Sequence, residues 1–126
     1  MPQPIRREVR PPNAPSPAFS YSQGIIVGDL LFIAGQVPRN PITDDVPATF
    51  IEQARQTLEN LSAVARAGGT SLSNAVKVNV YLDDLVSIHE LETVYPDYFV
   101  ATFPVRTTVR AGLRGYLVEI DATVAI

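Results

Sequence analysis

The chain has 126 residues, of which 46% are hydrophobic and 18% are charged, with a formal net charge of −3 at pH 7. This balance predicts one globular domain, and the acidic charge argues against a general affinity for nucleic acid, which needs clustered basic residues. No run of about 18 apolar residues occurs, so no membrane-spanning segment is predicted, and the chain contains no cysteine for disulfides, thiolate nucleophiles or metal ligation. Without a secretory signal pattern at the N-terminus, we expect a cytoplasmic protein.

The first segment, residues 1–17, is rich in proline and reads MPQPIRREVRPPNAPSP. Proline at this density favours extended backbone with few hydrogen bonds. We therefore predict an N-terminal arm that is mobile or lies over the surface, with Ile5 and Val9 as candidate anchors. A single folded domain is expected over residues 18–126.

Two strands are predicted at residues 25–27 and 30–34. The intervening pair Gly28-Asp29 suits a two-residue hairpin turn with glycine at its first position. Because residues 30–34 are apolar throughout, we expect the second strand to be buried on both faces.

A strong helix begins at Thr49, which forms a predicted capping box with Glu52. Apolar residues then recur at helical spacing, and Gly68-Gly69 ends the helix. A further strand follows at residues 76–81, where valines alternate with polar residues.

A second capping box, Ser87 with Glu90, predicts another helix. Pro96 lies inside its apolar stripe, where it removes a backbone hydrogen bond and can kink the axis. With the final strands, the order is strand, strand, helix, strand, helix, strand, strand. This order predicts an α+β fold in which two helices cover one face of a mixed sheet and leave the other for water, a ligand or a second subunit.

The last two strands, at residues 104–109 and 117–121, alternate in residue type and are separated by a short glycine-containing segment. We predict that they pair as a closing hairpin, with Arg106 opposite Asp121. Arg106 and Glu119 would then be diagonal neighbours on the open face, with Cβ atoms about 7–8 Å apart.

These side chains have both functional and structural interpretations. Arg106 can bind a carboxylate through two parallel hydrogen bonds, or form an ion pair with Asp121. Glu119 can act as a general acid/base if burial raises its pKa, or it is an ordinary strand carboxylate. Tyr21 offers an aromatic wall or simple packing, and Gly35 permits close approach of a ligand or marks a bulge.

Nothing in the sequence indicates a metal or cofactor. His89 is the only histidine, and the acidic residues are scattered, so no transition-metal site is predicted. No phosphate-binding glycine loop or nucleotide fingerprint occurs, and the glycines at 68–69 are explained by the end of the helix.

Several short motifs follow one another in a fixed order: Tyr21-Ser22-Gln23-Gly24, Gly35-Gln36-Val37-Pro38, Ala67-Gly68-Gly69, Tyr95 with Phe99, Phe103-Pro104-Val105-Arg106 and Val118-Glu119-Ile120. As an ordered set they resemble the reactive-intermediate deaminase family, also called RidA/YjgF, over residues 18–126. The resemblance implies a chorismate-mutase-like (YjgF-type) α+β fold. It also implies a homotrimer whose open sheet faces form a central barrel, with ligand clefts between subunits.

The resemblance further implies a cofactor-independent deaminase. Its substrates are small carboxylated enamines and imines such as 2-aminoacrylate, and its products are a 2-keto acid and ammonia. Arg106 would clamp the substrate carboxylate and Glu119 would handle water and protons. Tyr21, Ala34, Gly35 and Thr108 would complete the substrate site.

The sequence departs from the family pattern at several positions. Ala34 stands where serine is frequent, Thr108 where cysteine is frequent, and Glu92 where many members carry asparagine. The segment between Arg106 and Glu119 is shorter than in typical members. These departures leave the carboxylate clamp intact and bear on the substrate and the rate.

Two alternatives accompany the deaminase prediction. A non-catalytic module that binds a small carboxylate such as a 2-keto acid would use the same cleft, although Arg106 favours catalysis. An endoribonuclease or translation-inhibitor activity is disfavoured by the acidic balance and the absence of a basic, aromatic face.

Overall fold

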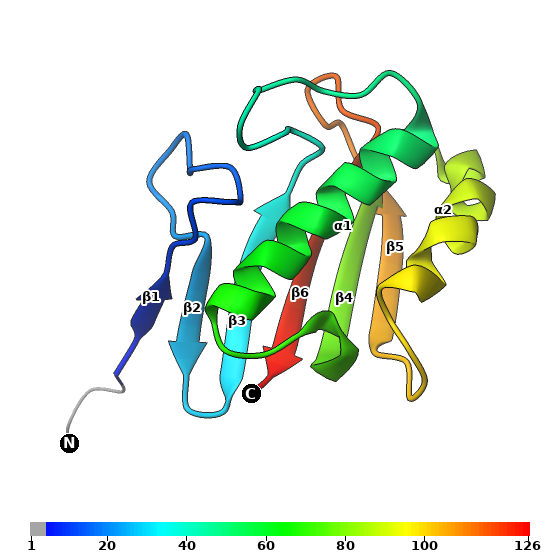
Figure 1. Ribbon diagram of the computed structural model, residues 1–126. Helices are drawn as coiled ribbons and strands as arrows, with labels where there is room; N and C mark the ends of the chain where they lie inside the picture. The colour runs from blue at the N-terminus through cyan, green and yellow to red at the C-terminus, as the bar shows by residue number, and fades with distance from the viewer. Residues whose placement is uncertain (1–4) are drawn as a thin grey trace.

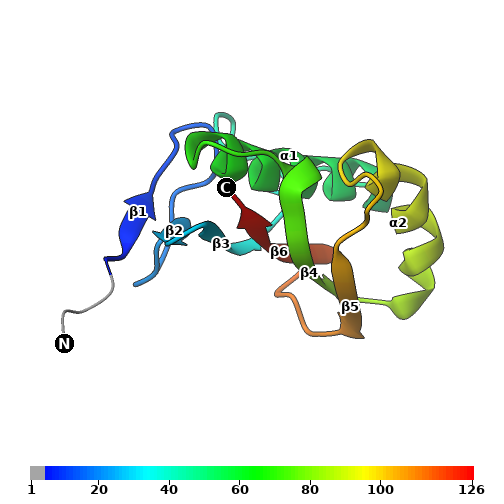
Figure 2. The same cartoon turned by 90° about the horizontal axis from the view of Figure 1, so that it is seen from below.

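A computed structural model describes residues 5–126 as a six-stranded mixed sheet with two helices on one side (Figure 1). The view from below shows both helices on the same side of the sheet (Figure 2). The predicted α+β architecture is therefore confirmed. In spatial order the strands are β1 (Arg7–Val9), β2 (Gly24–Val27), β3 (Leu30–Gln36), β6 (Val118–Ala125), β4 (Ala75–Leu82) and β5 (Val105–Arg110).

Helix α1 (Phe50–Ala67) crosses the sheet and is capped as predicted. The hydroxyl oxygen of Thr49 accepts a hydrogen bond of 3.2 Å from the backbone N–H of Glu52. At the other end, the N–H of Gly68 donates to the carbonyls of the last turn. Within residues 5–126, neither helix has the length and apolar character needed to cross a bilayer.

Helix α2 (Ile88–Val94) is short and begins differently from the prediction. The expected capping box at Ser87 is wrong, because its side chain makes no capping hydrogen bond. Instead, Asp84 accepts from the N–H of Val86 at 3.0 Å and caps the preceding 3₁₀ turn η2 (Leu85–Ser87). Pro96 ends α2 early, and the chain continues as the 3₁₀ turn η3 (Tyr95–Asp97). A further 3₁₀ turn, η1 (Leu72–Asn74), precedes β4.

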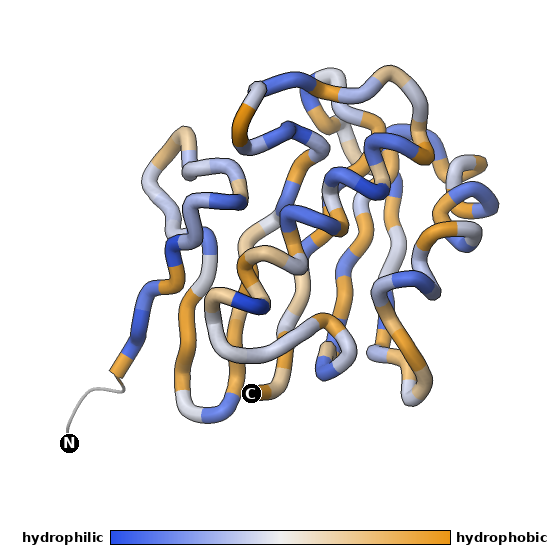
Figure 3. The backbone as a smooth tube through the Cα atoms, viewed as in Figure 1, coloured by the Kyte–Doolittle hydropathy of each residue, from blue (hydrophilic) through white to orange (hydrophobic). Residues whose placement is uncertain are grey.

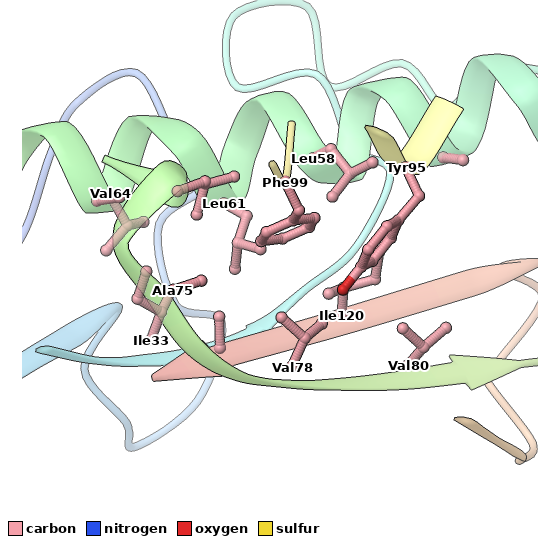
Figure 4. Packing of buried hydrophobic residues seen from close by; sticks show 14 of the residues in the cluster. Ile33, Leu58, Leu61, Val64, Ala75, Val78, Val80, Tyr95, Phe99 and Ile120 are labelled. Atoms are coloured by element: carbon pink, nitrogen blue, oxygen red, sulfur yellow. The ribbon is translucent and has the colours of Figure 1, made fainter. Parts of the chain in front are cut away.

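The hydrophobic core lies between the sheet and the two helices. Every second residue of β6 is buried, and polar and apolar residues alternate along the central strands (Figure 3). The rings of Tyr95 and Phe99 lie 4.5 Å apart between centroids and pack under α1 (Figure 4). The buried residues labelled there with them are Ile33, Leu58, Leu61, Val64, Ala75, Val78, Val80 and Ile120.

The hairpin between β2 and β3 has the predicted two-residue turn. Val27 pairs with Leu30, and Gly28 adopts a φ of 59° that favours glycine. The expectation that β3 is buried on both faces is wrong, since Leu30 and Phe32 are exposed while Leu31 is buried. The reason is that the helices cover only one face of the sheet.

The predicted closing hairpin of β5 and β6 is also wrong. Strands β4 and β5 are joined through α2 and pair in parallel, as strands linked by a helical crossover do. Strand β6 pairs antiparallel with the other side of β4, so β4 separates the two strands.

This order places Arg106 and Glu119 on opposite faces of the sheet. Arg106 pairs with Val78, which is fully buried beneath the helices. Glu119 pairs with Tyr81. Tyr81 lies three residues after Val78 on β4, so its side chain projects from the opposite face, and Glu119 therefore lies on the open face. The expectation that the two side chains are diagonal neighbours on one face does not hold within a single chain.

The N-terminal arm carries a hydrogen-bonded strand that its proline content did not predict. Strand β1 pairs antiparallel with β2. Val9 is only 6% exposed and joins the core, whereas Ile5 is 78% exposed and does not anchor the arm to its own domain.

Gln23 ties the rest of the arm to the domain. Its buried side-chain nitrogen donates to the carbonyl oxygens of Pro11 (3.3 Å), Ala14 (3.1 Å) and Pro15 (2.9 Å). The two N–H groups of one amide are therefore shared among three backbone acceptors, in a segment whose prolines cannot donate to a ladder.

Replacing Gln23 with Ala should loosen the arm. The loss of these buried hydrogen bonds is expected to cost about 1–3 kcal/mol and to leave three carbonyls unsatisfied. Trypsin should then cleave after Arg7 faster than in the unmodified protein, as followed by mass spectrometry. Ser16→Ala, on an exposed residue of the same arm, is the control. Equal cleavage rates in all three proteins would contradict the tether.

Candidate functional site

Four polar side chains meet on the open face of the sheet, where β6 and β4 lie side by side. Asp121 accepts hydrogen bonds from the side-chain nitrogen of Asn79 at 2.9 Å and from the hydroxyl of Tyr81 at 3.0 Å. Glu119, two residues away on the same strand, projects from the same face. Asp121 is thus held in place by two donors, next to a second carboxylate.

Glu119 has the electrostatic character of an acid/base group. Burial raises its pKa above the usual glutamate value, and the nearby charge of Asp121 raises it further. A carboxyl group in this state exchanges protons closer to neutral pH than an ordinary glutamate does.

A bulge in β3 places its backbone against Glu119. The register between β3 and β6 shifts so that Ala34 and Gly35 together face Asp121. A Cβ atom added to Gly35 would lie 2.5 Å from Oε2 of Glu119. The lack of a side chain at Gly35 therefore allows Glu119, the candidate acid/base group, to lie directly against the backbone of β3.

Arg106 lies in a separate cluster on the helix side of the sheet. Its Nη2 forms an ion pair with Oε1 of Glu92 from α2. Its guanidinium carbon lies 4.7 Å from the centroid of the Tyr95 ring. The alternative prediction of an ion pair with Asp121 is wrong, because Asp121 bonds its neighbours on the other face.

Tyr95 provides a fixed platform for Arg106. Burial raises the pKa of its hydroxyl, against the opposing effect of the arginine charge. The hydroxyl is buried, has no hydrogen-bond partner among the described residues, and points toward the sheet (Figure 4). The ring thus stays neutral and holds one face of the guanidinium.

Of the two remaining predicted residues, Thr108 lies on the same face as Arg106 and Tyr21 lies away from both clusters. Thr108 pairs with Val80 and projects from β5 on the same face as Arg106, half-buried. Tyr21 is 50% exposed and lines a small hollow of about 180 Å³ with Phe19 and residues of the arm. The hollow does not include Arg106 or Glu119.

Apart from Tyr21, the predicted site residues fall into two groups within one chain. The arginine cluster consists of Glu92, Tyr95, Arg106 and Thr108. The glutamate cluster consists of Ala34, Gly35, Asn79, Tyr81, Glu119 and Asp121. Asn79 and Tyr81 were not predicted; the alternation of β4 placed them on one face, but nothing in the sequence showed that β6 lies beside them.

A further hollow lies away from both clusters. A hollow of about 660 Å³ lies between the arm and the C-terminal end of α1, lined in part by Arg7, Arg10 and Arg66. It contains none of the predicted site residues. Across residues 5–126, no three His, Cys, Asp or Glu side chains gather as a metal site would require.

The family model described as Endoribonuclease L-PSP matches residues 11–126. The chain belongs to the RidA/YjgF family. A RutC family protein of Sinorhizobium fredii is 44% identical over 117 residues, covering 90% of this chain and 93% of that protein. The 2-iminobutanoate/2-iminopropanoate deaminase of Escherichia coli K12 is 36% identical over 115 residues, covering 87% and 90%.

Solved structures of RidA/YjgF proteins have the same fold. RidA from an Antarctic Psychrobacter superposes with a TM-score of 0.90 at 34% identity, covering 95% of this chain and 99% of that one. Escherichia coli TdcF with bound serine gives a TM-score of 0.87 at 31% identity, covering 95% and 98%. The YjgF-type fold expected from the motifs is confirmed.

The raised pKa of Glu119 predicts a pH-dependent cost in stability. A carboxyl whose pKa is higher in the folded state favours folding below its unfolded pKa, and this contribution is lost as the pH rises through the folded-state value. Glu119→Gln should therefore raise the melting temperature at pH 7–8, and the gain should shrink on acidification toward about pH 4. Thermal unfolding across pH measures this. Glu90→Gln, on an exposed residue of α2, is the control; an equal effect there, or no gain at pH 8, would argue against a desolvated Glu119.

Proposed function

We propose that the protein is a deaminase that hydrolyses small carboxylated enamines and imines, such as 2-aminoacrylate, to 2-keto acids and ammonia. The observation that carries the proposal is a half-buried glutamate with a raised pKa, packed against a glycine bulge. Its support is the membership in a family that includes a 2-iminobutanoate/2-iminopropanoate deaminase at 36% identity. Arg106, a half-buried arginine, would supply the carboxylate clamp.

Hydrolysis of an enamine acid needs a group that binds the carboxylate and a group that transfers protons, and Arg106 and Glu119 would supply them. An enamine acid takes a proton at C3 to become the iminium ion, which is the protonated form of the imine, and water then adds to C2. The amino group of that adduct is protonated and leaves as ammonia, while the hydroxyl loses its proton to give the keto acid. Glu119 would receive the proton of the attacking water and pass one to the leaving nitrogen. Acid/base help of this kind contributes about 10²–10⁴-fold.

We also propose that each site is built from two copies of the chain in a homotrimer. Arg106 and Glu119 lie on opposite faces of the sheet, so one chain does not bring them to one substrate. The open face also exposes Phe32, Val105 and Val109, which a second subunit would cover. The arginine cluster of one copy would meet the glutamate cluster of the next.

Arg106→Ala and Glu119→Gln should each abolish most of the activity. The first variant removes the carboxylate clamp and the second removes the acid/base group, and a loss of about 10²-fold or more is expected in both. The measurement generates the imine in situ and traps what survives with semicarbazide. Unchanged trapping by the wild-type protein on several imines would rule out a deaminase and leave a binding module.

Mixing the two inactive variants tests whether the site is shared. In a ring with head-to-tail contacts, random mixed trimers from equal amounts regain about one quarter of the wild-type sites. A site contained in a single chain would regain none. Subunits are exchanged by unfolding and refolding together, with each variant refolded alone as the control.

Gly35→Ala should reduce activity while preserving the fold. The atoms nearest to the added methyl would be Oε2, Cδ and Cγ of Glu119, at 2.5, 3.0 and 3.3 Å, so we expect that flexible side chain to move rather than the backbone. We expect a fall in kcat with a melting temperature close to wild type. Gly112→Ala, where an added Cβ meets nothing within 4 Å, is the matched control. A fully active Gly35→Ala protein would contradict the assigned position of Glu119.

A further inference from the structure

The contacts of Arg106 leave only part of its guanidinium available to a ligand. One face of the group is covered by the Tyr95 ring, at 4.7 Å from the centroid. Its Nη2 atom is in ion-pair contact with Oε1 of Glu92. A guanidinium has five N–H donors in a planar fork, so one two-donor edge remains for a carboxylate. A carboxylate bound at that edge of the guanidinium would have the Glu92 carboxylate as its neighbour on the same group.

Glu92 is placed to act on that ligand as well as on the arginine. Its side chain is 49% exposed, while that of Arg106 is 24% exposed. The glutamate is therefore more accessible than the cation it neutralises. An arginine that is paired in this way offers a simple anion no net charge, and a carboxylate arriving at its free edge meets a like charge.

We infer that Glu92 is a specificity residue that makes the clamp prefer carboxylates carrying a compensating positive charge. The ligand class is the zwitterion, which includes the iminium form of a 2-imino acid, the species that an enamine such as 2-aminoacrylate becomes when it is protonated at C3. The 2-keto acid of the same carbon skeleton, a simple anion, is disfavoured. This inference rests on the proposed function, since it concerns the arginine clamp of the same site.

The preference follows from charge balance at the arginine cluster. Arg106 and Glu92 together are neutral, so an anion makes the occupied arginine cluster negative whereas a zwitterion leaves it neutral. Hydrolysis removes the ligand's cationic nitrogen as ammonia and leaves only the carboxylate. The reaction itself therefore converts a favoured ligand into a disfavoured one, and the product is released more readily than it would be from an unpaired arginine.

Glu92→Gln tests this because glutamine keeps an oxygen acceptor for Arg106 while removing the negative charge. The probes are L-serine as the zwitterion and pyruvate as the anion, with dissociation constants measured by calorimetry on the intact protein. We expect pyruvate to bind about tenfold more tightly to the variant. The affinity for L-serine should change little or fall. In turnover assays, product inhibition by the keto acid should strengthen by a similar factor.

The controls separate this inference from the proposed function. Glu90→Gln removes a charge from the same helix without touching Arg106, and its affinities should equal those of wild type. Arg106→Ala should bind neither probe. Unchanged pyruvate affinity in Glu92→Gln, or no binding of either probe to either protein, would overturn the role of Glu92. Retained binding in Arg106→Ala would instead overturn the clamp, and with it the proposed deaminase site.

Discussion

The parallel crossover from β4 through α2 to β5 is the constraint on which the rest of the structure depends. It places β5 at the outer edge of the sheet and leaves the other side of β4 for β6. The two residues with the strongest chemical character then project from opposite faces. Arg106 is held by α2 and its following turn, whereas Glu119 is held by the strands alone. A topology that paired β5 with β6 directly would have merged the two clusters within one chain.

The glutamate cluster shows how one strand gives two carboxylates different environments. Asp121 accepts hydrogen bonds from Asn79 and Tyr81 and remains a structural anchor. Glu119, two residues earlier, is desolvated and lies beside that fixed charge, so its pKa rises. Neighbouring acids in unlike environments are how a fold separates a proton-transfer group from an electrostatic one.

Local signals in the sequence predicted most of the helices and strands correctly. The pairing of β5 with β6, which depends on residues far apart in the chain, was predicted wrongly. The cap of α1 at Thr49 and the turn at Gly28 depend on a few adjacent residues, and both were predicted correctly. The partner of β5 depends on where α2 carries the chain, which periodicity does not encode. The alternation within β5 and within β6 was predicted correctly. Which face of β5 lies on the same side of the sheet as which face of β6 could not be predicted without knowing that β4 lies between them. Glu92 was noticed only as a departure from a family pattern; its contact with Arg106 needed the fold.

The bulge at Ala34–Gly35 has a consequence for how this domain can vary in length. The extra residue turns Gln36 back toward the core, opposite Ile120, where it is 5% exposed. Beyond it, Asn60 of α1 holds the chain through the carbonyls of residues 37 and 39. Deleting one residue from β3 would reverse every side chain that follows and break this clasp. An insertion would be accommodated instead in residues 42–46, which are exposed. The length of β3 is therefore fixed by the register of its side chains, whereas the length of this loop can vary.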